Sequence, residues 1–186
     1  MRWDDLFADL EAQADALEVA ERAAEVSERA RIELGALGLI DRLRGAIGGP
    51  VRLRVAADLR IAGTLQRVGS DWLLVDEGVG REALVAMAAI HAVQGLGRVS
   101  AVPGADGAVP AKLGLRSALR GIARDRSAVR LHYGDGQVLD ATIDRVGADF
   151  VEVARHAAHE TRRRGEVREI VLVPIAGLAA IRRASV

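Results

Sequence analysis

The fold is decided by a stretch that occurs twice, VRLRVAADLRIAGTLQRVGSDWLLV at residues 51–75 and VRLHYGDGQVLDATIDRVGADFVEV at residues 129–153. The two stretches align without a gap and share nine of 25 residues, and Trp72 in the first corresponds to Phe150 in the second. Chance is a poor explanation for this identity, and self-similarity at a fixed spacing is typical of duplicated structural units. The chain therefore contains an internal duplication.

The similarity extends beyond these stretches on both sides. ALVAMAAIHAV at residues 83–93 matches VLVPIAGLAAI at 171–181, and LIDRLRG at 39–45 resembles LRSALRG at 115–121. Within the repeat, apolar and polar residues alternate as in a half-buried strand, and glycines and aspartates separate the strands. We therefore expect each unit to be a short helix followed by five short strands.

One segment gives conflicting signals. Residues 83–93 have the composition of a helix, but their counterpart carries Pro174 and Gly177 in its interior, and a helix tolerates an interior proline poorly. We therefore predict a strand, one tight turn and a second strand in both copies.

This order resembles the Sm/LSm-like small β-barrel. The resemblance is carried by a strand, a DG turn, a long bent strand with a central glycine, an Asp-aromatic turn, a strand, a V-P turn and a short strand. The predicted fold class is therefore mainly β with helices (α+β), a long N-terminal helix followed by two tandem Sm-like five-stranded barrels, each preceded by a short helix. The whole chain also resembles a conserved family of high-GC Gram-positive bacteria whose members are sometimes labelled Fis-type regulators, although the sequence shows no helix-turn-helix.

The predicted domain organisation follows from the repeat and from a Gly/Pro/Ala-rich stretch between its copies. The segments are an acidic amphipathic helix at 1–34, a first barrel at 35–96, a linker at 97–111, and a second barrel at 112–186 with a basic insertion at 154–170.

Residues 3–33 contain neither proline nor glycine and are rich in good helix formers. The apolar side chains recur at three- and four-residue spacing, which predicts one apolar stripe. The members of this candidate interaction helix are Trp3, Leu6, Phe7, Leu10 and Leu17. The stripe fits packing on the helix's own domain, a short coiled-coil contact with a second copy, or the binding of another partner.

The formal net charge of zero conceals an asymmetry. Through Glu33 the net charge is −6, and residues 34–186 carry +6, of which residues 112–186 supply +5. Such an asymmetry indicates an interaction surface or, alternatively, two solvated faces.

The basic insertion supplies the candidate phosphate contacts, because arginine forks suit phosphate groups. The candidate nucleic-acid-binding residues are Arg155, Arg162, Arg163, Arg164 and Arg168. The alternative is that the insertion is a solvated hairpin extension. The Sm resemblance also implies RNA binding. However, the positions that would read a base hold Gly69 and Leu73 in the first copy, so the usual uridine pocket is not expected. Arg67 and Arg145 occur in both copies and fit either ion pairs with Asp71 and Asp149 or a ligand role.

Several functional classes lack their motifs. The chain has no cysteine, which excludes disulfides, cysteine-ligated zinc and thiol catalysis, and no P-loop, GxSxG or HExxH motif. His156 and His159 are spaced i, i+3 with Glu160 beside them, which is only a weak signal for a metal site. No apolar run is long enough for a membrane span, and the acidic N-terminal segment lacks the pattern of a signal peptide. We therefore expect a cytoplasmic protein without enzymatic activity, cofactor or metal.

The sequence leaves two functions open. The first is a non-catalytic nucleic-acid-associated protein, with RNA or DNA as its partner and RNA favoured. The second is a protein–protein adaptor or scaffold that uses the N-terminal helix and the barrel edge strands. Self-association through the N-terminal helix belongs to the second, and neither function involves a membrane or a small-molecule substrate.

Overall fold

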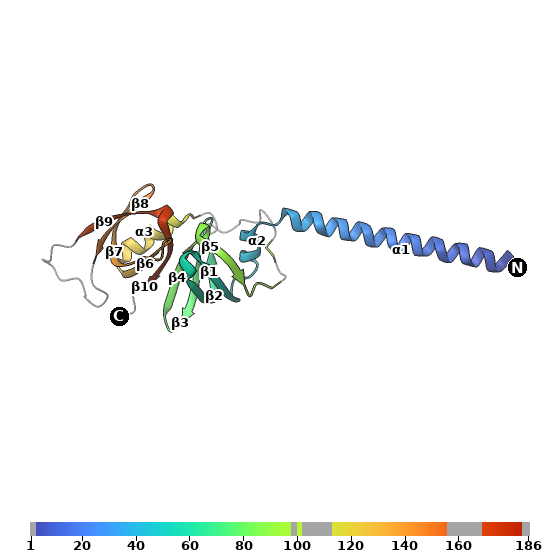
Figure 1. The fold of residues 1–186 in the computed structure, drawn as a ribbon, viewed down its shortest axis with the longest axis horizontal. Helices are drawn as coiled ribbons and strands as arrows, with labels where there is room; N and C mark the ends of the chain where they lie inside the picture. The colour runs from blue at the N-terminus through green and yellow to red at the C-terminus, as the bar shows by residue number, and fades with distance from the viewer. Residues whose placement is uncertain (1–2, 98–99, 102–112, 156–168, 184–186) are drawn as a thin grey trace. The chain divides into compact units, whose positions relative to one another are not determined.

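The computed structural model describes residues 3–97, 100–101, 113–155 and 169–183, which form two compact units, Met1–Gly38 and Leu39–Val186 (Figure 1). The first unit is helix α1, Trp3–Ala36, which confirms the helix predicted for residues 3–33. An exposed ion pair between Arg22 Nη2 and Glu18 Oε2, at 2.6 Å, spans one turn of it. Among the described helices, none combines the length and apolarity needed to cross a bilayer.

The second unit contains both copies of the repeat. The first copy comprises α2 (Leu39–Arg44), β1 (Pro50–Val55), β2 (Arg60–Val68), β3 (Trp72–Gly78), β4 (Arg81–Ala86) and β5 (Ile90–Gln94). The second comprises α3 (Leu115–Asp125), β6 (Ala128–Tyr133), β7 (Val138–Val146), β8 (Phe150–Arg155), β9 (Ile170–Pro174) and β10 (Leu178–Arg183). The predicted helix and five strands per copy are therefore present.

The strand–turn–strand prediction for the ambiguous segment is confirmed. A single 3₁₀ turn, Met87–Ala89, connects β4 to β5, and its counterpart Ile175–Gly177 connects β9 to β10. Tertiary pairing thus overrides the helical composition of residues 83–93, as the proline in the second copy indicated.

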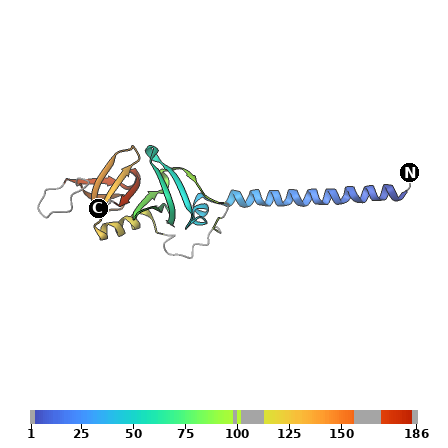
Figure 2. The same cartoon turned by 90° about the horizontal axis from the view of Figure 1, so that it is seen from below.

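The prediction of two separate five-stranded barrels is wrong. All ten strands form one open antiparallel sheet in the order β5-β1-β2-β3-β4-β10-β6-β7-β8-β9 (Figures 1 and 2). Within each copy the order is the same, and closure of the first copy would require β4 to pair with β5. Instead β4 pairs with β10 of the second copy. The edge that would close the first barrel therefore joins the two copies.

Two apolar cores lie along this sheet, and each contains residues of both copies. Ala179 and Ala180 of β10 belong to the core of the first copy. Trp72 and Leu84 of the first copy belong to the core of the second, together with Leu119 of α3. Burial of apolar surface drives folding, so the two copies are stabilised together.

Gly63 lies within the long second strand of the first copy, β2. A Cβ atom at this position would overlap the backbone carbonyl oxygen of Asp76 on β3, so glycine permits the close approach of the two strands. The second copy carries Ala141 at the corresponding position, fully buried on β7.

Candidate functional site: the repeat junction and the free sheet edges

The junction between the copies begins with the pairing of β4 and β10. Val85 lies opposite Ala180, and Leu84 lies opposite Ile181. A two-pronged ion pair crosses the same junction, because Arg182 Nε and Nη2 each lie 2.8 Å from a carboxylate oxygen of Glu77. Both side chains are largely shielded from water, which strengthens a charge-assisted pair of this geometry.

A second contact holds α3 against the turn between β2 and β3. The Leu115 N–H donates to Asp71 Oδ1 at 2.6 Å, and the Trp72 Nε1–H donates to the carbonyl oxygen of Leu113 at 2.8 Å. The N-cap residue of α3 is Gly114, which has no side chain to cap the helix. Asp71 of the first copy therefore satisfies an N–H group that the start of a helix leaves without an intrahelical partner, and its charge suits the helix N-terminus.

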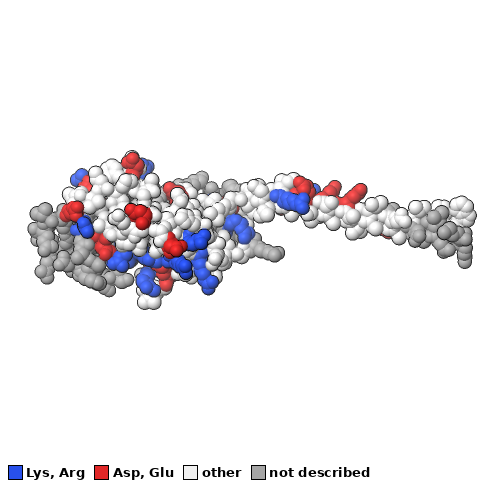
Figure 3. Space-filling model, in the orientation of Figure 1, with Lys and Arg blue, Asp and Glu red and all other residues white. Residues whose placement is uncertain are grey.

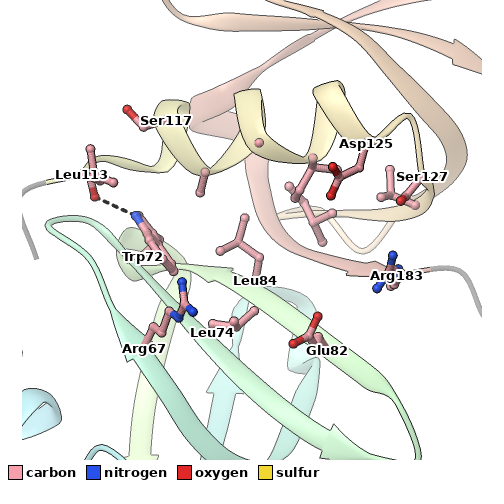
Figure 4. A pocket seen from close by; sticks show the side chains of 15 residues that line it. Arg67, Trp72, Leu74, Glu82, Leu84, Leu113, Ser117, Asp125, Ser127 and Arg183 are labelled. Carbon is pink, nitrogen blue, oxygen red and sulfur yellow. Dashed lines mark hydrogen bonds between the residues drawn. The ribbon is translucent and has the colours of Figure 1, made fainter. Parts of the chain in front are cut away.

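A cavity of about 440 Å³ lies between α3 and strands β3 and β4. Figure 4 shows α3 along one side, with Trp72, Leu74 and Leu84 projecting from the strands opposite. Charged side chains of both signs stand around this apolar floor, namely Arg67, Glu82, Asp125 and Arg183. Apolar hollows of this size with a few polar groups are typical binding sites, and here the lining comes from both copies.

The second copy repeats the surface of this junction but leaves it uncovered. Leu84 is 6% exposed, whereas its counterpart Leu172 on β9 is 62% exposed. Trp72 is 7% exposed, whereas its counterpart Phe150 is 37% exposed. The same apolar residues are therefore core in one copy and surface in the other.

The two ends of the sheet are edge strands. Within the described residues β9 pairs only with β8, and β5 pairs only with β1. β9 carries two large exposed apolar side chains, Ile170 and Leu172. An edge strand of this kind presents unpaired backbone groups to other chains, and proteins usually protect it with charge or coverage. The β9 edge is therefore a candidate interface.

The arginines predicted to contact phosphate lie mostly outside the described residues. This applies to Arg162, Arg163, Arg164 and Arg168, as it does to His156 and His159. Arg155 is described, at the end of β8, and its Nη1 lies 3.0 Å from Glu169 Oε2. This exposed ion pair partly neutralises the only described member of the predicted set.

Arg67 and Arg145 form no ion pair with Asp71 and Asp149 in the described part of the chain. That structural prediction is wrong, because the carboxylate of Asp71 instead accepts the Leu115 N–H. Arg67 lines the cavity between the copies, and a ligand role for it stays a prediction.

The first copy carries a group of arginines on neighbouring strands without ion pairs in the described structure. Arg52 and Arg54 project from β1 to solvent, and Arg54 lies directly opposite Arg60 of β2. Like charges directly opposite each other destabilise a sheet, and no ion pair involves these three side chains in the described structure. On the face that Figure 3 shows, basic side chains gather over the strands of the first copy, with acidic ones among them.

In the second copy the counterparts of Arg54 and Arg60 are His132 and Val138, so the facing pair of arginines is absent there. Arg130 on β6 lies opposite Asp140 on β7, with nitrogen–oxygen distances of 2.8 and 3.1 Å. This pairing raises the pKa of the Arg130 guanidinium. The location of the basic surface thus depends on which side chains face each other across the strands, Arg54 with Arg60 in one copy and Arg130 with Asp140 in the other, rather than on the count of charges.

His132 lies on β6, close to the junction. Burial, followed by the positive charges of Arg182 and Arg130, holds the pKa of His132 below its ordinary value of 6.5, although Glu77 and Asp140 oppose the shift. Its Nε2 atom is buried, and no hydrogen bond to it is present among the described groups. The fold therefore favours the neutral imidazole.

Among the described residues, no group of three or more histidines and carboxylates is placed to hold a metal ion. In α1, Trp3, Phe7, Leu10 and Leu17 are exposed, and the side chain of Leu6 is outside the described set. Their predicted role as an interaction stripe stays a prediction.

The chain was compared with protein-family models and with curated proteins. No protein-family model matches the chain, and no curated protein matches it. The resemblance to Sm-like proteins therefore stays a prediction as far as these comparisons go.

The helix cap between the copies predicts a stability difference between two equivalent aspartates. Asp71→Ala removes the acceptor of the Leu115 N–H and should lower the free energy of unfolding by about 1 kcal/mol. Asp149→Ala is the matched control, since its exposed side chain makes no hydrogen bond in the described structure, and it should change little. Urea unfolding at high dilution measures both; equal effects would contradict the capping role.

The environment of His132 predicts a loss of stability in mild acid. Because the pKa is lower in the folded state than in the unfolded state, the unfolded chain binds more protons as the pH falls below about 6.5. The stabilisation present above that pH is then lost progressively down to the folded-state pKa. His132→Gln should flatten this dependence in urea unfolding measured between about pH 5 and 8, whereas substitution of the exposed His91 to Gln should not. An unchanged pH profile in His132→Gln would refute the assignment.

Proposed function

We propose that the protein is a non-catalytic protein–protein adaptor that binds a partner strand along the free edge of β9. The observation that carries this proposal is the exposure of Ile170 and Leu172 on the edge strand β9. The counterpart of β9 in the first copy is β4, which is paired with β10. Strand addition gives affinity through main-chain hydrogen bonds and specificity through alternate side chains.

The junction between the copies supports this mode of binding, because there the strand β10 of the second copy is added to the edge strand β4 of the first. β10 lies along β4 by antiparallel pairing, and Leu84 is buried beneath the added strand and α3. β9 has the same position in its copy, the same pairing to its inner neighbour and a leucine at the same place. A partner strand on β9 would bury Leu172 as β10 and α3 bury Leu84.

The other parts of the proposal rest on the sequence. The lack of catalytic motifs supports a non-catalytic role, and a cytoplasmic location is proposed on the sequence pattern alone. The exposed stripe of α1, which includes Trp3 and Phe7, supports a second contact to a protein partner.

A second candidate function is the binding of a polyanion such as RNA, and it is favoured by the arginines of the first copy. Arg54 and Arg60 face each other across β1 and β2 without an acidic partner among the described side chains. A phosphate bound between them would relieve their repulsion, and guanidinium groups bind phosphate in a forked geometry. This surface differs from the predicted one in the basic insertion.

The adaptor proposal predicts that one exposed leucine controls the capture of partners. Tagged full-length protein, the Leu172→Lys variant and a Val138→Lys control are compared in a lysate of the source organism by quantitative mass spectrometry. Val138 is also exposed, but lies on β7 inside the sheet. Leu172→Lys should reduce recovery of specific partners at least about tenfold, because it charges the centre of the interface. Equal recovery with all three proteins would contradict the proposal.

The polyanion proposal predicts a change in salt dependence. Arg54→Gln combined with Arg60→Gln should weaken binding to a mixed-sequence single-stranded RNA, and should make the slope of log K against log salt shallower by about 1.4 between about 50 and 200 mM. Arg22→Gln with Arg31→Gln removes the same charge from α1 and should leave the slope unchanged. The absence of RNA binding by the wild-type protein at low salt would exclude this function.

A further inference from the structure

On the basis of the proposed adaptor function, we infer that the partner strand on β9 is β5 of a second copy of this chain, so that the protein associates head to tail. The two complementary halves of the internal junction occur a second time on the same chain. One half is the β9 edge with the turn before β8, and the other half is β5 with the start of α2.

The register of the internal junction defines the contact between chains. In that junction Leu84 of β4 lies opposite Ile181 of β10. In the repeat alignment Leu84 corresponds to Leu172 and Ile181 corresponds to Val93. The equivalent contact between chains therefore places Leu172 of one chain opposite Val93 of the next. Leu172 is exposed, Val93 is only partly buried, and the strands that carry them are the two edges of the sheet. An antiparallel β9–β5 pair would therefore continue the same sheet from chain to chain.

The helix contact is duplicated as well. Leu113-Gly114-Leu115, which docks on Asp71 and Trp72, has a counterpart of identical sequence at the start of α2, Leu37-Gly38-Leu39. The receiving turn is duplicated as Asp149-Phe150. Leu115 is 5% exposed, whereas Leu39 is 49% exposed. Asp71, Trp72 and Leu115 contact one another inside the chain. Their counterparts Asp149, Phe150 and Leu39 are exposed.

The docking turn has the same local geometry in both copies, which supports its reuse. A Cβ added at Gly69 would collide with the indole of Trp72, and one added at Gly147 would collide with the ring of Phe150. Each aromatic ring therefore lies over the glycine of its own turn. The surface that receives Leu113 in the first copy is preformed in the second.

The segment that covers α2 also fits this arrangement. Arg42 Nη1 donates to Ser100 Oγ at 3.1 Å, and the Ala101 N–H donates to the carbonyl oxygen of Asp41 at 2.9 Å. The counterparts of Asp41 and Arg42 on α3 are Ser117 and Ala118, which line the cavity between the copies. Residues 97, 100 and 101 thus lie along the face of α2 that corresponds to the cavity-lining face of α3. In a contact between chains they would lie where the internal junction has its cavity.

One difference makes the contact between chains weaker than the junction within the chain. The ion pair of Arg182 and Glu77 corresponds to Gln94 and Arg155, which do not form an ion pair with each other. Association should therefore depend on protein concentration. A head-to-tail contact uses different surfaces on the two chains and leaves one of each free, so it either extends or closes into a ring.

The test uses complementary variants of the full chain in sedimentation-velocity experiments at about 1–100 µM. Leu172→Lys blocks the β9 half, and Leu39→Lys blocks the α2 half. Wild-type protein should show a mass that rises with concentration, whereas each variant alone should stay monomeric. An equimolar mixture of the two variants should form a two-chain species and nothing larger, because one intact half remains on each. The exposed Val138→Lys control should assemble like the wild type.

Three outcomes would overturn the inference: a wild-type protein that is monomeric throughout, single variants that assemble like the wild type, or a mixture that stays monomeric. Circular dichroism confirms that each variant is folded, and Phe150→Ser and Val93→Lys replace a variant that is not. A monomeric wild-type protein with Leu172-dependent capture of a different protein would reject self-association and retain the adaptor function. If Leu172→Lys alters neither assembly nor capture, both proposals fail.

Discussion

The pairing of β4 with β10 is the interaction on which the rest of the structure depends. A strand at the end of a sheet leaves backbone N–H and C=O groups without protein partners, and buried groups of this kind must be paired. Because β10 satisfies β4, the first copy does not close on itself. The sheet stays open, each core takes residues from the other copy, and a cavity remains between α3 and β4. The two outermost edges are then a direct consequence of the same pairing.

The sequence was sufficient for the elements of the fold because each copy could be read against the other. Pro174 resolved the ambiguity of residues 83–93, which have a helical composition in isolation, and the short helices and turns followed from the same alignment. The lateral order of strands was not predictable in this way. An alternating pattern specifies which face of a strand is buried, but it carries no information about which strand lies beside it. Leu84 and Leu172 are the same residue in the same pattern, yet one is core and the other is surface.

The charged surface was predictable only in part, and for a related reason. Counting charges places the basic excess in the second copy, but the count takes no account of partners. Arg130 is matched by Asp140 across the sheet, and Arg155 by Glu169, whereas Arg54 lies opposite Arg60. The first copy, although its net charge is smaller, therefore carries two arginines that face each other across neighbouring strands without described ion pairs. Cross-strand register, which determines these pairings, is a property of the assembled sheet.

The β4–β10 junction within the chain and the proposed β9–β5 contact between chains differ in how they depend on protein concentration. Within the chain, the linker holds the second copy near the first, so β10 meets β4 at an effective concentration that does not depend on how much protein is present. A β9–β5 contact has no such advantage. It also lacks a counterpart to the ion pair of Arg182 and Glu77, whose two prongs are shielded from water. The internal junction is thereby made in every folded chain, whereas the contact that we propose between chains would be reversible. The ion pair of Arg182 and Glu77 thus helps to make the junction within the chain more stable than the proposed contact between chains, where Gln94 and Arg155 take the corresponding positions.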